Sequence, residues 1–159
     1  MAKIPGFKIS HFTLHLLEGD EIYDLTLADV SATSDGVSGS TPKTFELRTD
    51  IRAFSVKVGR ETWDASSIGQ DAPDYLPLRS NFEVTGTAYV NPSTGRSYEA
   101  LYTGAGKYYA LYIEDKSDDP PKTTKAVVLV GEVEDEISDD GSRMLSFEMK
   151  GAGQHPIFT

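Results

Sequence analysis

The sequence predicts a mainly β protein: one domain built as an antiparallel β-sandwich or open barrel with a single flanking α-helix. Three observations support this prediction. Apolar and polar residues alternate in several segments of strand length, as they do in half-buried strands. Only one segment has the three- and four-residue apolar spacing of a helix. Turn residues separate these segments, and 159 residues is the length of one domain.

The composition limits the classes of function. The chain has no cysteine, so it can form neither a disulfide nor a thiolate metal site. It has no apolar run long enough to span a membrane and no signal peptide, so we expect a protein made in the cytoplasm. The net charge of −10, from 25 acidic and 15 basic residues, has the wrong sign for binding DNA phosphates or an anionic membrane. It indicates a solvated surface, or one that must not hold polyanions.

A predicted arm begins the chain and is followed by two predicted strands. Residues 1–10 include a proline and a glycine and indicate an extended N-terminal arm. Residues 11–17 alternate, which places His11 and His15 on the polar face as expected surface residues. A metal site would need a third ligand, which the sequence does not position. Residues 22–30 are expected to form the second strand.

Two irregular stretches interrupt the next strands. Residues 31–44 are rich in Ser, Thr and Gly, have no apolar face and predict a long loop. Strand-like segments follow over residues 45–59, where Gly59 suggests a bulge. Residues 65–78 are expected to form a polar connector, because Pro73 and Pro77 lack the amide donor that a sheet interior needs.

A new strand at residues 80–90 leads into the only expected helix, at residues 93–103. Asn91 can cap this helix through its side-chain oxygen, as can Ser93. A glycine beyond residue 103, Gly104 or Gly106, is expected to end it. A helix of about three turns must pack on a sheet, because it cannot form a layer of its own.

Three more strands complete the predicted sheet, at residues 107–114, 123–137 and 143–150. The pair Asp140-Gly141 is a strong hairpin signal between the last two strands. Alternation in the last strand points three apolar side chains inward: Leu145, Phe147 and Met149. Residues 151–159 have no periodicity and indicate a second, C-terminal arm.

The long strand at residues 123–137 has one apolar and one acidic face in its second half. The expected apolar face holds Val127, Leu129, Gly131 and Val133. The expected acidic face holds Glu132, Glu134 and Glu136. Carboxylates two residues apart point the same way along a strand and cannot converge on one calcium ion, so they indicate a solvated acidic surface.

The sequence lacks recognisable catalytic chemistry. It has no nucleophile-elbow serine motif, no zinc-protease histidine pair and no dinucleotide fingerprint. The paired acids Asp118-Asp119 and Asp139-Asp140 fall in predicted turns, where carboxylates are normally solvated. We therefore expect neither an enzyme nor a bound metal or cofactor.

Two segments carry a family resemblance. In Trp63–Ser80, a strand ends in the polar turn WDASSIG, continues through the acidic, proline-containing DAPDYLP, and leads to the strand Phe82–Gly86. Met144–Gly153 forms a closing strand with a small-residue end. These features, which span residues 61–153, resemble the major tail tube proteins of long, non-contractile-tailed bacteriophages. That family also has a single helix flanking its sandwich, at the point where one is predicted here.

The resemblance implies the tail tube fold and a structural virion protein. Copies of such a protein self-assemble into hexameric rings whose sheets form one barrel, and stacked rings form the tube through which DNA passes without specific binding. The implied partners are further copies of the chain, the tape measure protein and the tail terminator. The implied location is the virion tail, assembled in the host cytoplasm without a membrane.

Two site hypotheses follow from this resemblance. The acidic residues Glu132, Glu134 and Glu136 are expected to face the lumen, where like charge disfavours sticking of DNA. The long loop and the termini are expected to mediate contacts between rings. The loop residues concerned are Ser34, Asp35, Gly36, Val37, Ser38 and Gly39.

Two other readings remain open from the sequence. Tyrosines at residues 108, 109 and 112, together with Trp63, could form the platform of a carbohydrate-binding β-sandwich module, although aromatic clusters on strands more often pack in a core. A tube subunit of a type VI secretion system would share the same assembly principle. The segment Trp63–Ser80 favours the phage family.

Overall fold

The computed structural model describes residues 9–37, 43–64, 75–93, 95–117 and 120–159. These residues form one eight-stranded antiparallel sheet, in the order β2-β1-β5-β6-β7-β4-β3 with β8 paired to β6. The strands are β1 (Ile9–Leu17), β2 (Thr44–Glu46), β3 (Ile51–Asp64), β4 (Tyr75–Tyr89), β5 (Tyr108–Asp115), β6 (Lys122–Ile137), β7 (Arg143–Gly151) and β8 (Ile157–Phe158). The predicted mainly β, antiparallel class is confirmed.

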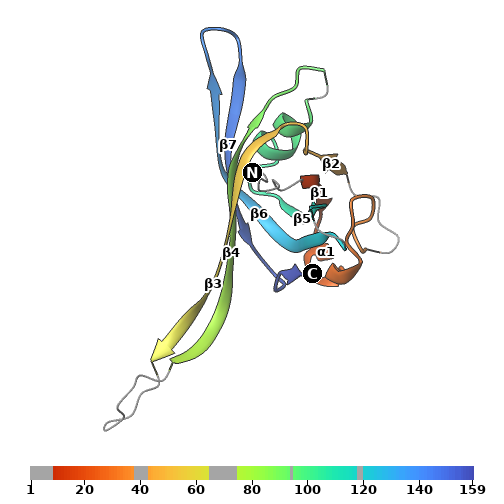
Figure 1. Ribbon diagram of the computed structural model, residues 1–159, viewed down its shortest axis with the longest axis vertical. Helices are drawn as coiled ribbons and strands as arrows, with labels where there is room; N and C mark the ends of the chain where they lie inside the picture. The colour runs from red at the N-terminus through yellow and green to blue at the C-terminus, as the bar shows by residue number, and fades with distance from the viewer. Residues whose placement is uncertain (1–8, 38–42, 65–74, 94, 118–119) are drawn as a thin grey trace, which may run out of the picture.

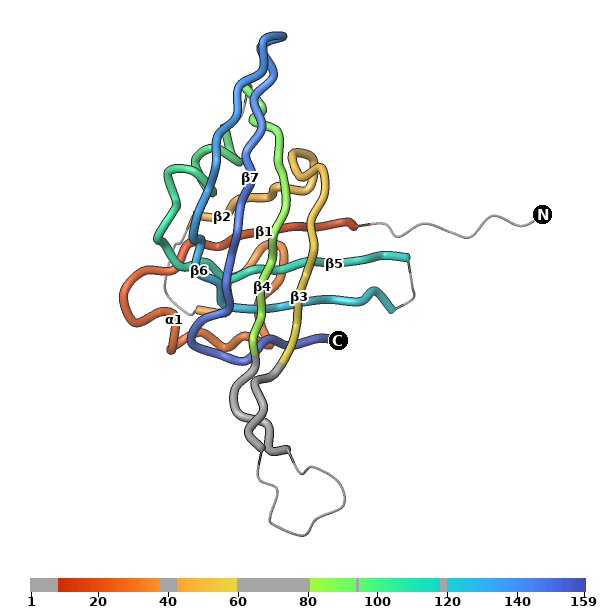
Figure 2. The backbone as a smooth tube through the Cα atoms, turned by 90° about the vertical axis from the view of Figure 1, so that its left-hand side faces the viewer, coloured from red at the N-terminus to blue at the C-terminus, as the bar shows by residue number. Residues whose placement is uncertain are grey.

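The sheet bends into two layers that cross each other. β3, β4 and β7 run along the long axis of the molecule, whereas β1 and β5 run across it (Figure 2). β6 belongs to both layers, because residues 122–129 pair with β5 and residues 128–137 pair with β7. The register shifts between Val130 and Val133, which is the irregularity that lets one strand turn from one layer into the other.

The main core lies between the two layers. Phe12 of β1 is fully buried and packs edge-on against Phe54 of β3, with ring centroids 5.2 Å apart, and against Phe147 of β7 at 6.3 Å. The inward positions predicted for the last strand are confirmed, since all three side chains belong to this core: Leu145, Phe147 and Met149. Aromatic packing across the layers therefore joins β1 to the β3–β4–β7 layer.

The strand predicted at residues 22–30 is wrong. This segment forms the short helix α1 (Glu21–Asp24) and the 3₁₀ turn η1 (Leu27–Asp29). Its buried residues are spaced by three, Ile22 with Leu25 and Leu27 with Val30. That spacing suits helical turns packed on a surface, and here they form a second core with residues of β5 and β6.

The expected flanking helix is present but shorter than predicted. η2 (Tyr98–Tyr102) is a single π-helical turn, closed by a bond from the Thr103 N–H to the Tyr98 carbonyl. The predicted start at Ser93 is wrong, because Gly95 has a φ of 62° that a right-handed helix cannot contain. Asn91 Oδ1 accepts the Ser93 N–H and so caps the preceding turn instead. At the far end, Gly106 has the positive φ expected beyond the helix.

The β3–β4 hairpin projects from one end of the molecule (Figure 1). The sequence predicted that no strand could include Pro77, but β4 contains it, paired with Thr62 beside a register shift. β7 pairs with β4 only over Glu83–Tyr89, so at Pro77 a missing amide donor costs no second ladder bond. The connector residues 65–74, with Pro73, lie outside the described residues.

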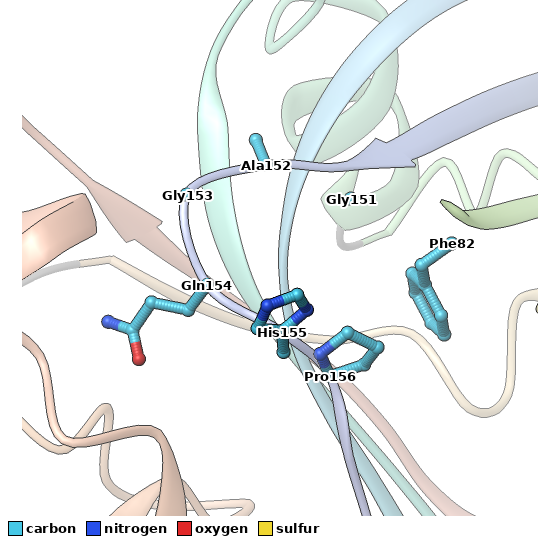
Figure 3. Close-up of a pocket in the computed structure, with 7 residues that line it drawn as sticks. All are labelled: Phe82, Gly151, Ala152, Gly153, Gln154, His155 and Pro156. Carbon is cyan, nitrogen blue, oxygen red and sulfur yellow. The ribbon is translucent and has the colours of Figure 1, made fainter. Parts of the chain in front are cut away.

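The predicted C-terminal arm folds back onto its own chain. β8 pairs with β6 through Thr124–Phe158 and Lys125–Ile157. The Gln154 amide donates to the Leu25 carbonyl at 3.0 Å. Figure 3 shows Gln154 among the residues of the C-terminal segment that line a pocket together with Phe82. The C-terminal segment is therefore part of the described fold, whereas most of the predicted N-terminal arm, residues 1–8, lies outside it.

Candidate assembly surfaces

The longitudinal layer ends in two unpaired strand edges. In the described part of the chain, β3 is the last strand of the sheet and has a neighbour on one side only. β6 residues 133–137 pair with β7, but β5 stops pairing at Leu129, so the other side of this segment is also unpaired. Both edges present backbone donors and acceptors that another strand can pair with.

One face of this layer is polar and turned away from the core. Along each strand, residues of this face alternate with core residues. Directly opposed residues of neighbouring antiparallel strands point to the same face, so the face continues from strand to strand. This polar face includes Ser55 and Lys57 of β3, Glu83, Thr85, Thr87 and Tyr89 of β4, Met144, Ser146, Glu148 and Lys150 of β7, and Glu134 and Glu136 of β6. The polar face thus extends from one unpaired edge to the other.

The structure separates the three glutamates expected on one acidic face. Glu134 and Glu136 lie opposite Ser146 and Met144, on the polar face at the β6 edge. Glu132 falls within the register shift and has no directly opposed residue. All three side chains are exposed.

The apolar face predicted for β6 is wrong. Val127 packs in the second core, whereas Val133 packs against the main core on the opposite face. The shift after Val130 adds one residue to β6 relative to β7, so the two faces of β6 exchange there.

Several charged side chains on both faces of this layer make contacts within the chain. On the polar face, the Arg52 guanidinium lies 4.6 Å from the centre of the Tyr89 ring, and Lys150 is 3.6 Å from Glu148. On the core side, Arg143 donates hydrogen bonds through Nε and Nη2 to the Asp135 carboxylate and thereby holds the pKa of that carboxyl below its usual range. The core-side charges are therefore paired within the chain.

Two valines on the core side of β3 are left uncovered. Val56 and Val58 lie opposite the core residues Val84 and Phe82, yet they are 39% and 52% exposed. β3 is the edge strand, so no further strand of the sheet lies beside these two side chains. An apolar strip next to an unpaired strand edge is a typical contact surface for another protein chain.

The described part of the predicted inter-ring loop is attached to the body of the protein. Ser34, Asp35, Gly36 and Val37 are described, whereas Ser38 and Gly39 lie outside the described residues. Asp35 is buried, Val37 packs against the second core, and the Gly36 carbonyl accepts the Thr26 N–H. At Gly36, a φ of 75° and a Cβ position only 2.5 Å from the Thr26 oxygen require glycine.

A buried histidine connects the two ends of this loop. His15 was expected at the surface, but it is fully buried because α1 and η1 cover that face of β1. Its Nε2 donates to the Ser31 carbonyl at 2.7 Å, and its Nδ1 is 2.9 Å from Thr44 Oγ1. Burial lowers the pKa of His15, against the opposing effects of the Ser31 bond and the nearby carboxylates Asp35 and Glu46. The neutral ring therefore holds residues 31 and 44 in place.

Replacing His15 with glutamine is expected to remove a pH-dependent part of the stability. Since folding lowers the His15 pKa, the folded chain is fully stabilised above its ordinary value of 6.5 and loses stability as the pH falls below it. Above pH 6.5 the variant should be about 1–3 kcal/mol less stable than the wild type, because the buried hydrogen-bond partners of the His15 ring are no longer fully satisfied. Urea unfolding measured at several pH values would show a flatter profile for the variant.

The contribution of Glu46 to stability changes at lower pH than that of His15, so it does not affect the comparison of the two pH profiles. Burial opposes ionisation of Glu46, but hydrogen bonds from the Phe12 N–H, His11 and Thr13 outweigh it and lower the pKa. Its contribution is therefore lost only below its ordinary value of 4.5. An unchanged slope between pH 4.5 and 6.5 in the His15→Gln protein would show that another group causes it.

The structure gives little support to a sugar-binding or metal-binding surface. Tyr109 and Tyr112 are buried, so the tyrosines of β5 do not form an exposed platform, and the Trp63 side chain lies outside the described residues. Within the described residues, no three His, Cys, Asp or Glu side chains gather as a metal site. In the same residues, no helix is long and apolar enough to cross a membrane.

Comparison with solved structures identifies the fold. The chain superposes on the SPP1 tail tube with a TM-score of 0.58 and 12% identity, covering 94% of this chain and 76% of that one. It matches the tail of the empty gene transfer agent particle, determined with C6 symmetry, with a TM-score of 0.54 and 13% identity, covering 90% and 99%. A chain of the native gene transfer agent virion matches with a TM-score of 0.50 and 13% identity, covering 69% and 85%.

These matches define the class of fold. The chain has the tail tube fold, and the sequence resemblance to tail tube proteins is confirmed at the level of the fold. No protein-family model and no curated protein matches the sequence.

Proposed function

We propose that this chain is the structural subunit of the tail tube of a long, non-contractile phage tail or a related particle, and that it is not an enzyme. The observation that carries the proposal is the longitudinal layer of a tail tube fold, with unpaired edges on both β3 and β6. Copies assemble into hexameric rings and the rings stack. The C6 symmetry of the matching gene transfer agent tail supports six copies per ring.

The strand directions are compatible with ring closure. β6 and β4 run in the same direction, and β3 runs opposite to both. A rotation about an axis along the strands keeps these directions, so β6 of the next copy would lie antiparallel to β3. Such a heterologous contact repeats around a ring and leaves no free edge in the barrel.

The polar face then lines the lumen with Glu134 and Glu136 among its carboxylates, and the exposed Glu132 next to it in the register shift is proposed to face the lumen as well. Unpaired carboxylates repel DNA phosphates within about 8–10 Å in physiological salt, so DNA passes without being held. The tape measure protein occupies the lumen before DNA, and the tail terminator caps the tube. The protein is located in the virion tail after assembly in the host cytoplasm, and it has no membrane partner.

Contacts between stacked rings are assigned to the long loop, residues 31–44, and to the chain termini. The loop residues proposed for this role are Ser34, Asp35, Gly36, Val37, Ser38 and Gly39. Attachment of the loop base through His15 supports the proposal, since a contact loop loses less entropy on binding when its ends are already fixed.

Electron microscopy of the purified protein at rising concentration tests the proposal. Rings or hollow tubes of uniform diameter are expected, with six copies per ring. A protein that stays monomeric at every concentration, also with the tape measure partner added, would contradict it.

The lumen assignment has a separate test in the assembled tube. Because the chain lacks cysteine, one can be placed at Thr85 on the polar face, with a control at Tyr23, which is exposed on α1 on the other side of the core. In stacked tubes, a bulky polyethylene glycol maleimide should label Tyr23→Cys but not Thr85→Cys, whereas a small maleimide should label both. Equal labelling by the bulky reagent would place the polar face outside.

A further inference from the structure

The two edges of the longitudinal layer carry opposite charges at the same height. Glu136 of β6, Met144 of β7 and Tyr89 of β4 are directly opposed neighbours on the polar face. Arg52 of β3 completes this row, because its guanidinium lies over the Tyr89 ring, 4.6 Å from its centre. The row therefore begins with an acid at one unpaired edge and ends with a base at the other.

These charges have no ionic partner in the described part of the chain. The ion pairs there involve other side chains, and Arg52, Glu134 and Glu136 form none of them. All three side chains are exposed. Arg52 lies at the register shift between Ile51 and Ala53, and the Tyr89 ring beneath it restricts where its guanidinium can point. The base is thus held in position at the edge.

We propose that Arg52 of one copy forms an ion pair with Glu136 or Glu134 of the next copy, and that this pair sets the register between neighbouring β3 and β6 strands. The inference rests on the proposed function and identifies which surface of the partner copy each edge meets. Closure of a tilted layer can shift the register by two residues, which keeps every side chain on its face. The two glutamates are spaced by two residues, so either register leaves a carboxylate beside Arg52.

The position of Lys57 shows that opposite charges face each other across the two edges only in the row of Arg52. Lys57 also lies on the polar face of β3, in the row of Glu83 and Lys150. The β6 residue of that row is Leu129, where β5 already occupies the strand edge. Lys57 therefore has no acid at the opposite edge, and Lys57→Glu is a charge-matched control on the same strand and face.

Charge complementarity of this kind chiefly selects the correct partner and register. Exposed pairs add little affinity, but like charges brought together at an interface are strongly unfavourable. Each ring contains the contact once per copy, so a reversed charge acts at every interface. We expect Arg52→Glu to raise the concentration needed for ring formation by about tenfold or more, since like-charge contacts cost several times the energy of a tenfold change.

The decisive experiment mixes two variants that each fail alone. In Arg52→Glu both edges are acidic, and in the double variant Glu134→Arg, Glu136→Arg both edges are basic. An equal mixture restores an acid against a base at every contact, provided that the copies alternate around a ring with an even number of members. Sedimentation velocity and negative-stain microscopy of each protein and of the mixture give the assembled fraction, and circular dichroism checks the fold.

Rings in the mixture but not in either variant alone support the inference, with Lys57→Glu assembling as the wild type does. The inference is overturned if the wild type forms rings and Arg52→Glu forms them equally well. It is also overturned if the mixture does not recover ring formation. Either result leaves the proposed function standing. A wild-type protein that never forms rings overturns the proposed function and this inference with it.

Discussion

Replacing Phe12 with alanine is expected to lower the free energy of unfolding by about 3–5 kcal/mol, because the substitution removes a large, fully buried side chain between two crossed layers. Phe54 and Phe147 both pack against its ring, at 5.2 and 6.3 Å between centroids, so neither layer can close the cavity without moving its backbone. Urea unfolding of unassembled protein, at concentrations below ring formation, gives the stability without a contribution from assembly.

Phe158→Ala is the matched control for this measurement. Phe158 belongs to the two-residue strand β8 and is 50% exposed, so its loss should cost only about 1 kcal/mol. Equal losses for the two variants would show that the contact between the crossed layers does not dominate the stability of the fold.

Replacing Val56 and Val58 together with aspartate is expected to abolish ring formation while leaving the monomer folded. Both positions are open to water in the single chain, where a carboxylate remains solvated. In a ring closed through the β3 edge they would be covered by the next copy, and burying two unpaired charges at each contact is strongly unfavourable. Microscopy and sedimentation measure ring formation, and circular dichroism with urea unfolding measures the fold.

Ser55→Asp provides the control from the same strand. Ser55 directly precedes Val56 but lies on the polar face, so a carboxylate there would face the proposed lumen and remain solvated, and rings should still form. Rings of the Val56→Asp, Val58→Asp protein at wild-type concentrations would show that the core side of β3 lies outside the contact between copies.

Unpaired strand edges can pair with strands of other chains. A flat, apolar edge pairs with any exposed strand, whereas charged side chains at the edge restrict which strand can approach. Arg52 on β3, with Glu134 and Glu136 on β6, places opposite charges on the two edges. This arrangement disfavours pairing of like edges and is compatible with the proposed β3-to-β6 contact between copies.

Local features of the sequence determined much of the longitudinal layer. The inward set Leu145, Phe147 and Met149 follows from the strand period of two, which depends only on neighbouring residues. Gly141 adopts a φ of 88° in the hairpin turn, and the Asp-Gly pair selects that turn without help from the rest of the chain. The negative charge and the absence of cysteine likewise follow from composition.

Only the tertiary structure decided which faces are covered. Residues 22–30 could form a strand by composition, but their apolar side chains bury best as short helical turns against β5 and β6. Those turns bury His15, whose polar partners come from residues far along the chain. β6 exchanges its faces after Val130 because it must pair with β5 and then with β7 in crossed layers. Each of these outcomes depends on contacts between distant segments, which a period of two or three along the sequence does not encode.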